Sequence, residues 1–145
     1  MELGEGDQDE HLPYVRAGFA VLSYSLDGHI RDLKNASDAQ IRQAALEFLA
    51  AKSGLTNAKV ALEWLSAKVP EVDKERIYAA GHSSAGTVAL LLAENEPRIK
   101  KCAAFAARSD VESNFPAPQK TALRQAIPGV DAFFTTYNRP GATTS

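Results

Sequence analysis

Apolar and polar residues follow one another along the chain in blocks that predict strands and helices in turn. Residues 19–24, FAVLSY, form a short apolar and aromatic run that predicts a buried strand. After a polar turn, Ser37 and Gln40 form a capping box, and apolar residues then recur at helical spacing over residues 41–49. This pattern predicts an amphipathic helix that Gly54 closes.

The next blocks predict a helix, a strand, a helix and a strand. A helix is expected over residues 57–68, ended by Pro70, with one apolar face formed by Val60, Ala61, Trp64 and Leu65. Residues 76–83 then predict a strand, residues 84–93 a strongly apolar helix and residues 100–107 a second strand. This order is typical of parallel strands with right-handed crossovers, and it predicts the α/β fold class.

The pattern weakens in the last third of the chain. Residues 108–119 are polar and contain two prolines, which predicts a loop, and residues 121–126 predict a short helix. Residues 1–10 and 139–145 are expected to be flexible. A core or interface position, rather than a pocket, is expected for Phe115, Phe133, Phe134 and Tyr137.

Composition narrows the classes of function. The 145 residues are 45% apolar, which suffices for one hydrophobic core. A formal net charge of −2 and the lack of a basic stripe argue against nucleic-acid binding. No apolar run is long enough to cross a membrane, and no basic export signal follows Met1. The single cysteine, Cys102, favours a reducing compartment such as the cytoplasm, and no pattern indicates a metal or another cofactor.

The stretch GHSSAG, which begins at Gly81, lies where a predicted strand turns into a predicted helix. A serine on such a turn is typical of the nucleophile elbow, whose pattern is G-x-S-x-G. The tight turn requires small residues two positions before and two positions after the serine. For Ser83 these residues are Gly81 and Ala85, whereas for Ser84 one of them is His82, whose ring does not fit. The sequence therefore predicts Ser83 as the nucleophile.

The chemistry follows from this placement. A general base must remove the Ser83 proton, and the start of the following helix favours negative charge nearby. The backbone N–H of Ser84 is expected in the oxyanion hole. His82 should point away from Ser83, because successive side chains of a strand point to opposite sides. The residues expected to shape the turn are Gly81, Ala85 and Gly86.

Two other interpretations of the same residues remain open. GHSSAGT, from Gly81 to Thr87, matches a phosphate-binding loop except that its lysine is missing, so nothing supplies the charge contact to the phosphates. The stretch also fits a plain Gly/Ser turn that connects a strand to a helix.

The elbow region resembles a known family. DKERIYAAGHSSAGTVALLLA is similar to the elbow of α/β-hydrolases, in particular the prolyl oligopeptidase and dienelactone hydrolase branches, in which Asp-x-x-Arg-Ile commonly leads into Gly-His-Ser. These residues are here Asp73, Arg76, Ile77, Gly81, His82 and Ser83. YVRAGFAVLSYSLDG resembles the strand that precedes the crossover helices, so the resemblance covers roughly residues 10–107. It implies a serine hydrolase fold with an acyl-serine intermediate.

The departures from the family concern the other catalytic groups. In the family the acid and then the histidine follow the serine along the chain. No histidine follows Ser83 here, because His11, His29 and His82 all precede it. Asp110 lies just after a predicted strand, where a minority of these hydrolases place the acid, although a loop or capping aspartate is the plainer interpretation.

The family's oxyanion-loop strand also has no counterpart in this sequence. In the family's sheet it lies between the strands that correspond to residues 19–24 and 76–83, so these two segments are not expected to pair directly. We therefore expect a single incomplete α/β-hydrolase domain over residues 1–145, lacking its histidine base. The expected function is a peptidase or esterase that acts on a peptide or small molecule through Ser83. The alternative is a non-catalytic α/β binding module with a remnant elbow, and unpaired strand edges suggest self-association.

Overall fold

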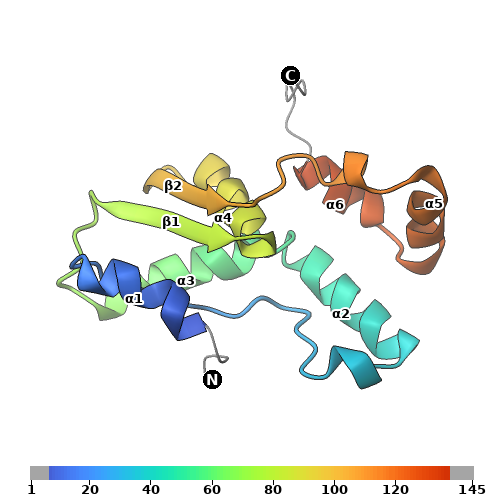
Figure 1. The fold of residues 1–145 in the computed structure, drawn as a ribbon, viewed down its shortest axis with the longest axis horizontal. Helices are drawn as coiled ribbons and strands as arrows, with labels where there is room; N and C mark the ends of the chain where they lie inside the picture. Colours follow the sequence, from blue (N-terminus) through green and yellow to red (C-terminus); the bar gives the residue numbers. More distant parts are fainter. Residues whose placement is uncertain (1–6, 138–145) are drawn as a thin grey trace.

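A computed structural model describes residues 7–137 of the chain. This part is mixed α/β, which confirms the predicted class, and it contains six α-helices and a two-stranded parallel sheet (Figure 1). In chain order the elements are α1 (Asp7–Arg16), the 3-10 turn η1 (Leu33–Asn35), α2 (Asp38–Ala50), α3 (Leu55–Lys68), β1 (Ile77–His82), α4 (Ser84–Asn95), β2 (Ile99–Phe105), the 3-10 turn η2 (Glu112–Asn114), α5 (Ala117–Ala126) and α6 (Val130–Tyr137).

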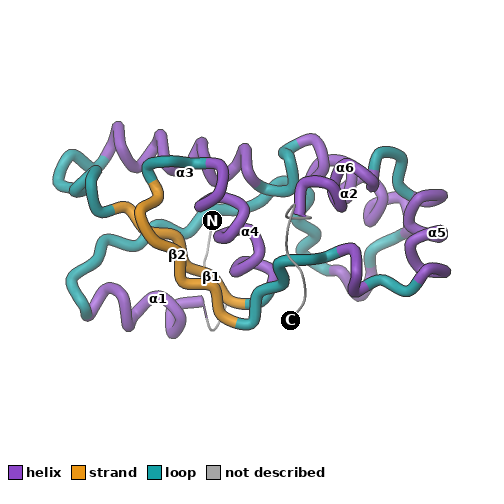
Figure 2. The backbone as a smooth tube through the Cα atoms, turned by 90° about the horizontal axis from the view of Figure 1, so that it is seen from above, coloured by secondary structure: helices purple, strands orange, loops and turns teal. Residues whose placement is uncertain are grey.

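The segment β1–α4–β2 forms the centre of the fold. β1 and β2 pair in parallel from Ile77 opposite Ile99 to His82 opposite Phe105, as predicted, with α4 as the connection between them. α4 buries Gly86, Thr87, Val88, Ala89, Leu91 and Leu92. Viewed from above, α3 and α4 lie on one side of the strands and α1 lies on the other (Figure 2). The core therefore lies between the sheet and the α3–α4 layer.

The predicted helix at α2 is confirmed, and its start has a clear cause. The Ser37 side chain accepts a hydrogen bond from the Gln40 backbone N–H, while the Gln40 side chain accepts one from the Ser37 backbone N–H. α2 ends before Lys52, Ser53 and Gly54, which all have positive φ and reverse the chain into α3.

The apolar face predicted for α3 is only partly covered, since Ala61 and Leu65 are half-buried. Val60 and Trp64 are 63% and 52% exposed, and the buried residues are Leu55, Ala58 and Leu62. These three also follow helical spacing, and Leu55 and Ala58 share one buried cluster with residues of α4. α3 carries two apolar stripes, and its position against α4 determines which of them is buried.

The predicted strand over residues 19–24 is also wrong. This segment has no regular secondary structure, and Phe19, Val21 and Tyr24 are exposed. A strand requires a hydrogen-bonded neighbour, and β1 pairs with β2 alone in the part of the chain that the structure describes. The segment forms no strand that could pair with β1, and Phe19 contacts Tyr78 of β1 through an edge-to-face ring contact at 5.9 Å.

The last third is more helical than predicted. α5 begins at Ala117, earlier than expected, with Pro118 in its first turn, and α6 was not predicted. Phe134 is 2% exposed and contacts the half-buried Phe115 and Phe133, so the expected core position is confirmed for Phe134. The Tyr137 side chain lies outside the described part. Of the ends expected to be flexible, residues 1–6 and 139–145 lie outside the described residues. Residues 7–10 form the start of α1.

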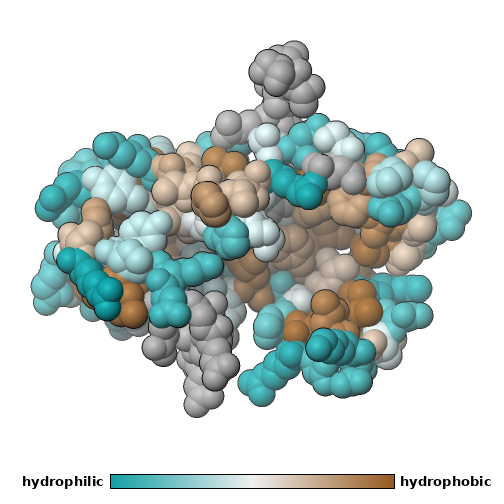
Figure 3. All heavy atoms as spheres, viewed as in Figure 1, coloured by the Kyte–Doolittle hydropathy of each residue, from teal (hydrophilic) through white to brown (hydrophobic). Residues whose placement is uncertain are grey.

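Much apolar surface remains exposed outside this centre. Apolar side chains show at the surface between the sheet and the α2, α5 and α6 helices (Figure 3). The most exposed large apolar side chains are those of Phe105, Leu33, Val60, Trp64 and Val15.

Candidate active site

The turn between β1 and α4 consists of one residue, Ser83. Its backbone has φ 54° and ψ −121°, a conformation that residues with a side chain rarely adopt, and Ser84 is already the first residue of α4. Holding a serine in such a conformation costs about 1–3 kcal/mol, which the surrounding structure has to supply. The strained residue of the turn is thus Ser83, the serine that the sequence predicts as the nucleophile.

Close backbone packing explains the small residues around this serine. A Cβ atom at Gly81 would collide with the Ala85 backbone and lie 2.6 Å from the Gly86 nitrogen. A Cβ atom at Gly86 would lie 2.8 Å from the Gly81 carbonyl oxygen. The predicted requirement at Gly81 therefore has a direct physical cause, and it extends to Gly86.

Four hydrogen bonds fix the turn: one to β2, two between Ser83 and Thr87 of α4, and one from the loop after β2 to Thr87. The Ser83 N–H donates to the Phe105 carbonyl at 2.8 Å, and the Thr87 N–H donates to the Ser83 carbonyl at 3.1 Å. The buried Thr87 hydroxyl also donates to the Ser83 carbonyl, at 3.4 Å, and accepts from the Arg108 N–H at 3.1 Å. The sequence interpretation gave Thr87 no structural role. Its spacing of four residues from Ser83, which suits a bond to that carbonyl, was the available signal.

The surroundings of Ser83 suit a developing negative charge. Ser83 and Ser84 are exposed at the start of α4, where the first backbone N–H groups of a helix have no acceptor within the helix. These N–H groups and the helix dipole stabilise an anion at this position. The expected oxyanion-hole donor, the Ser84 N–H, lies at this helix start.

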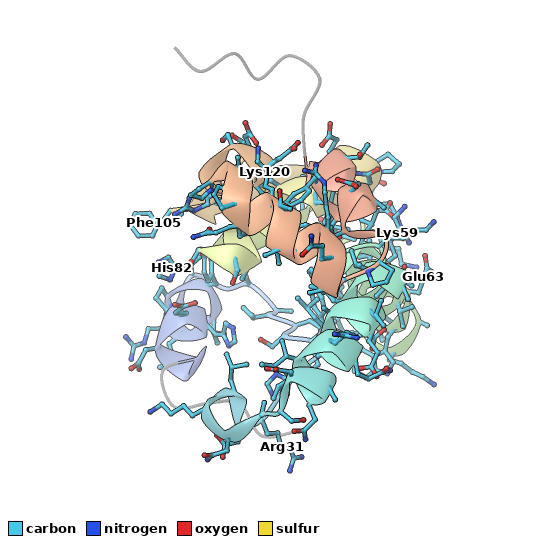
Figure 4. The ribbon with its side chains drawn as sticks, turned by 90° about the vertical axis from the view of Figure 1, so that its right-hand side faces the viewer. Arg31, Lys59, Glu63, His82, Phe105 and Lys120 are labelled. Atoms are coloured by element: carbon cyan, nitrogen blue, oxygen red, sulfur yellow. The ribbon has the colours of Figure 1, made fainter. Side chains whose placement is uncertain are left out.

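None of the three histidines forms a hydrogen bond to Ser83 within residues 7–137. The His82 ring packs on Phe105 at 5.4 Å, and its Nδ1 lies 3.4 Å from a Glu10 carboxylate oxygen. Figure 4 shows His82 and Phe105 together at one side of the molecule. His11 Nε2 lies 3.0 Å from the Ser23 hydroxyl oxygen. The packing role predicted for His82 agrees with its contact to Phe105.

The third histidine lies away from the turn in sequence. His29 lines a pocket of about 480 Å³ that residues 24–30 form with Leu33 and Phe48. No residue of the turn lines this pocket. The pocket therefore offers no binding volume beside Ser83.

Asp110 holds a loop turn. One of its carboxylate oxygens accepts a hydrogen bond from the Ser113 N–H at 3.0 Å, just before η2. Hydrogen bonding from Ser113 lowers the pKa of this carboxyl below its ordinary value. This contact agrees with the capping interpretation, and the acid role of Asp110 stays a prediction.

The described residues contain neither a cluster of metal ligands nor a membrane-spanning helix. Within residues 7–137, no three potential metal ligands of the His, Cys, Asp or Glu type lie together. None of the described helices combines the length and the apolar character that crossing a membrane requires. Comparison of the chain with protein-family models, curated proteins and solved structures gave no match.

Proposed function

We propose that this chain is the elbow-bearing part of an α/β-hydrolase-type serine hydrolase, a peptidase or an esterase, with Ser83 as the nucleophile. The observation that carries the proposal is the strained backbone of Ser83 between a strand and a helix. A plain connecting turn has no need for a serine at positive φ, since glycine adopts that conformation at no steric cost. Strain of this kind concentrates at functional sites.

The proposed reaction is acyl transfer through the Ser83 hydroxyl. A general base takes the hydroxyl proton while Oγ attacks the carbonyl carbon of an ester or a peptide. The carbonyl oxygen becomes an anion that the Ser84 N–H and the start of α4 stabilise. Loss of the alcohol or amine leaves an acyl-serine, and water then releases the acid and restores the serine.

The base is the missing component. His82 is in contact with Glu10 and Phe105, and His11 with Ser23, while His29 lines a pocket formed by a distant segment. We infer that the base comes from a segment or chain other than residues 7–137. The chain alone is then expected to turn over substrate weakly or not at all, because an unactivated serine is a poor nucleophile.

A non-catalytic α/β binding module is the second candidate. It is favoured by the lack of a hydrogen-bonded histidine at Ser83 in the described part, and by Phe105, which is 75% exposed beside the turn. The phosphate-binding alternative is disfavoured. The Thr87 hydroxyl already bonds Ser83 and Arg108, and Gly81 packs directly on the Gly86 backbone, so no space for a phosphate lies between them.

A fluorophosphonate probe tests the proposal, with imidazole added to act as the missing base. Labelling should be slow in buffer, should become faster as imidazole increases, and should vanish in Ser83→Ala. Ser84→Ala is the matched control, because it keeps the backbone N–H and should still be labelled. Labelling that survives Ser83→Ala would refute the assignment, and a lack of labelling at any imidazole concentration would favour the binding module.

A further inference from the structure

Helix α1 contacts its own chain through Glu10 and His11, and of residues 9–16 all but the half-buried His11 are exposed. Glu10 contacts His82, and His11 contacts Ser23. Successive helix residues are 100° apart, so Asp9, Leu12 and Arg16 lie on the side opposite these two contacts. All three are exposed, with Leu12 39% accessible. Along the outer face of α1, an acidic, an apolar and a basic side chain thus follow one another.

Helix α3 also exposes an outer face, formed by Val60, Glu63 and Trp64, with the half-buried Lys59 beside them. Val60 and Trp64 are more than half exposed, although they are one helical turn apart on an apolar stripe. Beside them lies a pocket of about 270 Å³, lined by Lys52, Leu55, Thr56, Lys59, Val60 and Glu63. Lys52 and Lys59 line this pocket, and Glu63 follows one turn later. Along the outer face of α3, basic side chains are therefore followed by the apolar Val60 and then by an acidic side chain.

The two outer faces complement each other when the helices lie parallel. Asp9 and Arg16 are about 10 Å apart along α1, and Thr56 and Glu63 are equally far apart along α3. In this register Asp9 meets the Lys52 and Lys59 ammonium groups, and Leu12 enters the pocket against Val60. Arg16 then meets Glu63, which already bonds Arg98 at 2.7 Å, and the Trp64 ring.

One copy of the chain cannot bring these faces together. α1 and α3 lie on opposite sides of the β1–β2 sheet (Figure 2). Figure 4 shows Lys59 and Glu63 on the side of the molecule away from His82, the residue that α1 contacts. We propose that the partner is a second copy of this chain, with α1 of one copy docked on α3 of the next. Such a head-to-tail contact leaves a free face at each end, so assemblies grow with concentration.

Sedimentation velocity of the full chain over a range of concentrations tests this proposal. We expect association that the double variant K52E/K59E weakens about tenfold or more, as does Asp9→Lys, because each places like charges together. Raising the salt concentration should weaken association of the unmodified chain as well. The double variant K34E/K74E changes the same net charge at exposed lysines outside both faces and should associate normally.

A charge-exchange experiment identifies the contact directly. An equimolar mixture of D9K and K52E/K59E should recover association, because the ammonium group introduced into α1 of one variant meets the carboxylates introduced beside α3 of the other. Circular dichroism of each variant alone confirms that it is folded. A chain that stays monomeric would overturn the proposal. Association that neither variant nor salt changes would also overturn it and would indicate pairing of strand edges instead.

Discussion

The β1–α4–β2 unit and the N-terminal region from α1 to α2 are built from similar proportions of apolar residues but differ in burial. Half of the twelve α4 residues are buried, whereas α2 and η1 bury none. The unit combines a hydrogen-bonded strand pair with a helix packed across it. In the N-terminal region α1 lies beside the sheet and α2 lies away from it, and none of residues 9–50 is fully buried.

This difference shows why the strained serine can persist. A residue in a sparsely populated backbone conformation persists only where several independent contacts hold it in that conformation. Ser83 has such surroundings, because its N–H, its carbonyl and the neighbouring glycines are all fixed by β2 and α4. The segment over residues 19–26 has no comparable set of contacts and no regular secondary structure.

The same substitution in the two regions should reveal this contrast most strongly. Leu92→Ala removes a side chain that is 6% exposed, and it should lower the free energy of unfolding by about 3 kcal/mol. Leu46→Ala in α2 removes one that is 36% exposed, and it should cost about 1 kcal/mol or less. Urea denaturation followed by circular dichroism measures both. Equal losses would show that α2 is as well packed as α4.

A second contrast separates crowding from backbone conformation at glycine. Gly81→Ala places a methyl group against the Ala85–Gly86 backbone and should cost about 2–3 kcal/mol, because a backbone cannot move aside cheaply. Gly18→Ala has open space but a φ of +86°, so it should cost about 1 kcal/mol. The same urea experiment compares them. A smaller loss for Gly81→Ala than for Gly18→Ala would mean that the turn is looser than its contacts imply.

The sequence predicted the unit around Ser83 well because its signals are local. The apolar helix and the small residues around Ser83 each act within a few positions of the chain, as does the capping box that begins α2. The failures depend on distant partners. Residues 19–24 have the composition of a strand but no neighbouring strand to which they could hydrogen-bond. α3 has two apolar stripes, and its contact with α4 determines which stripe is buried.

The candidate site shows the same division. The position of Ser83 and the packing of Gly81 followed from GHSSAG alone. The bond from the Arg108 N–H to the Thr87 hydroxyl joins residues 21 positions apart, and no sequence pattern marks such a pair. Ala106, just after β2, has a positive φ. The sequence does not indicate this, because alanine has no preference for that conformation.

The ion pairs at the α4–β2 connection offer a pH test of the well-packed region. Glu96 is buried and bonds Arg98 at 2.7 Å, which lowers the Glu96 pKa from 4.5 to about 2. The folded state therefore holds fewer protons than the unfolded state, so this stabilisation is complete above pH 4.5 and is lost as the pH falls towards 2.

Urea midpoints between about pH 6 and pH 3 measure this loss, which should be smaller than the effect of Gly81→Ala. Glu96→Gln should reduce the loss of the free energy of unfolding at acid pH. Glu75→Gln is the matched control, since the Glu75 side chain is 85% exposed and lies 3.8 Å from Lys100, and it should leave this loss unchanged. An unchanged loss in Glu96→Gln would mean that other carboxylates govern the acid response.

The smallest expected effect concerns Ser83 itself and has the opposite sign. Ser83→Gly relieves a φ of 54° that costs a serine about 1–3 kcal/mol, while glycine gives the unfolded chain roughly 0.5–1 kcal/mol of extra entropy. The variant should thus be about 1 kcal/mol more stable. Ser83→Ala keeps the strain and loses the hydroxyl, so its stability should change little. If both variants are stabilised equally, the hydroxyl is the source of the cost. If Ser83→Gly alone is stabilised, the backbone stores strain at the one residue that the proposed chemistry requires to be a serine.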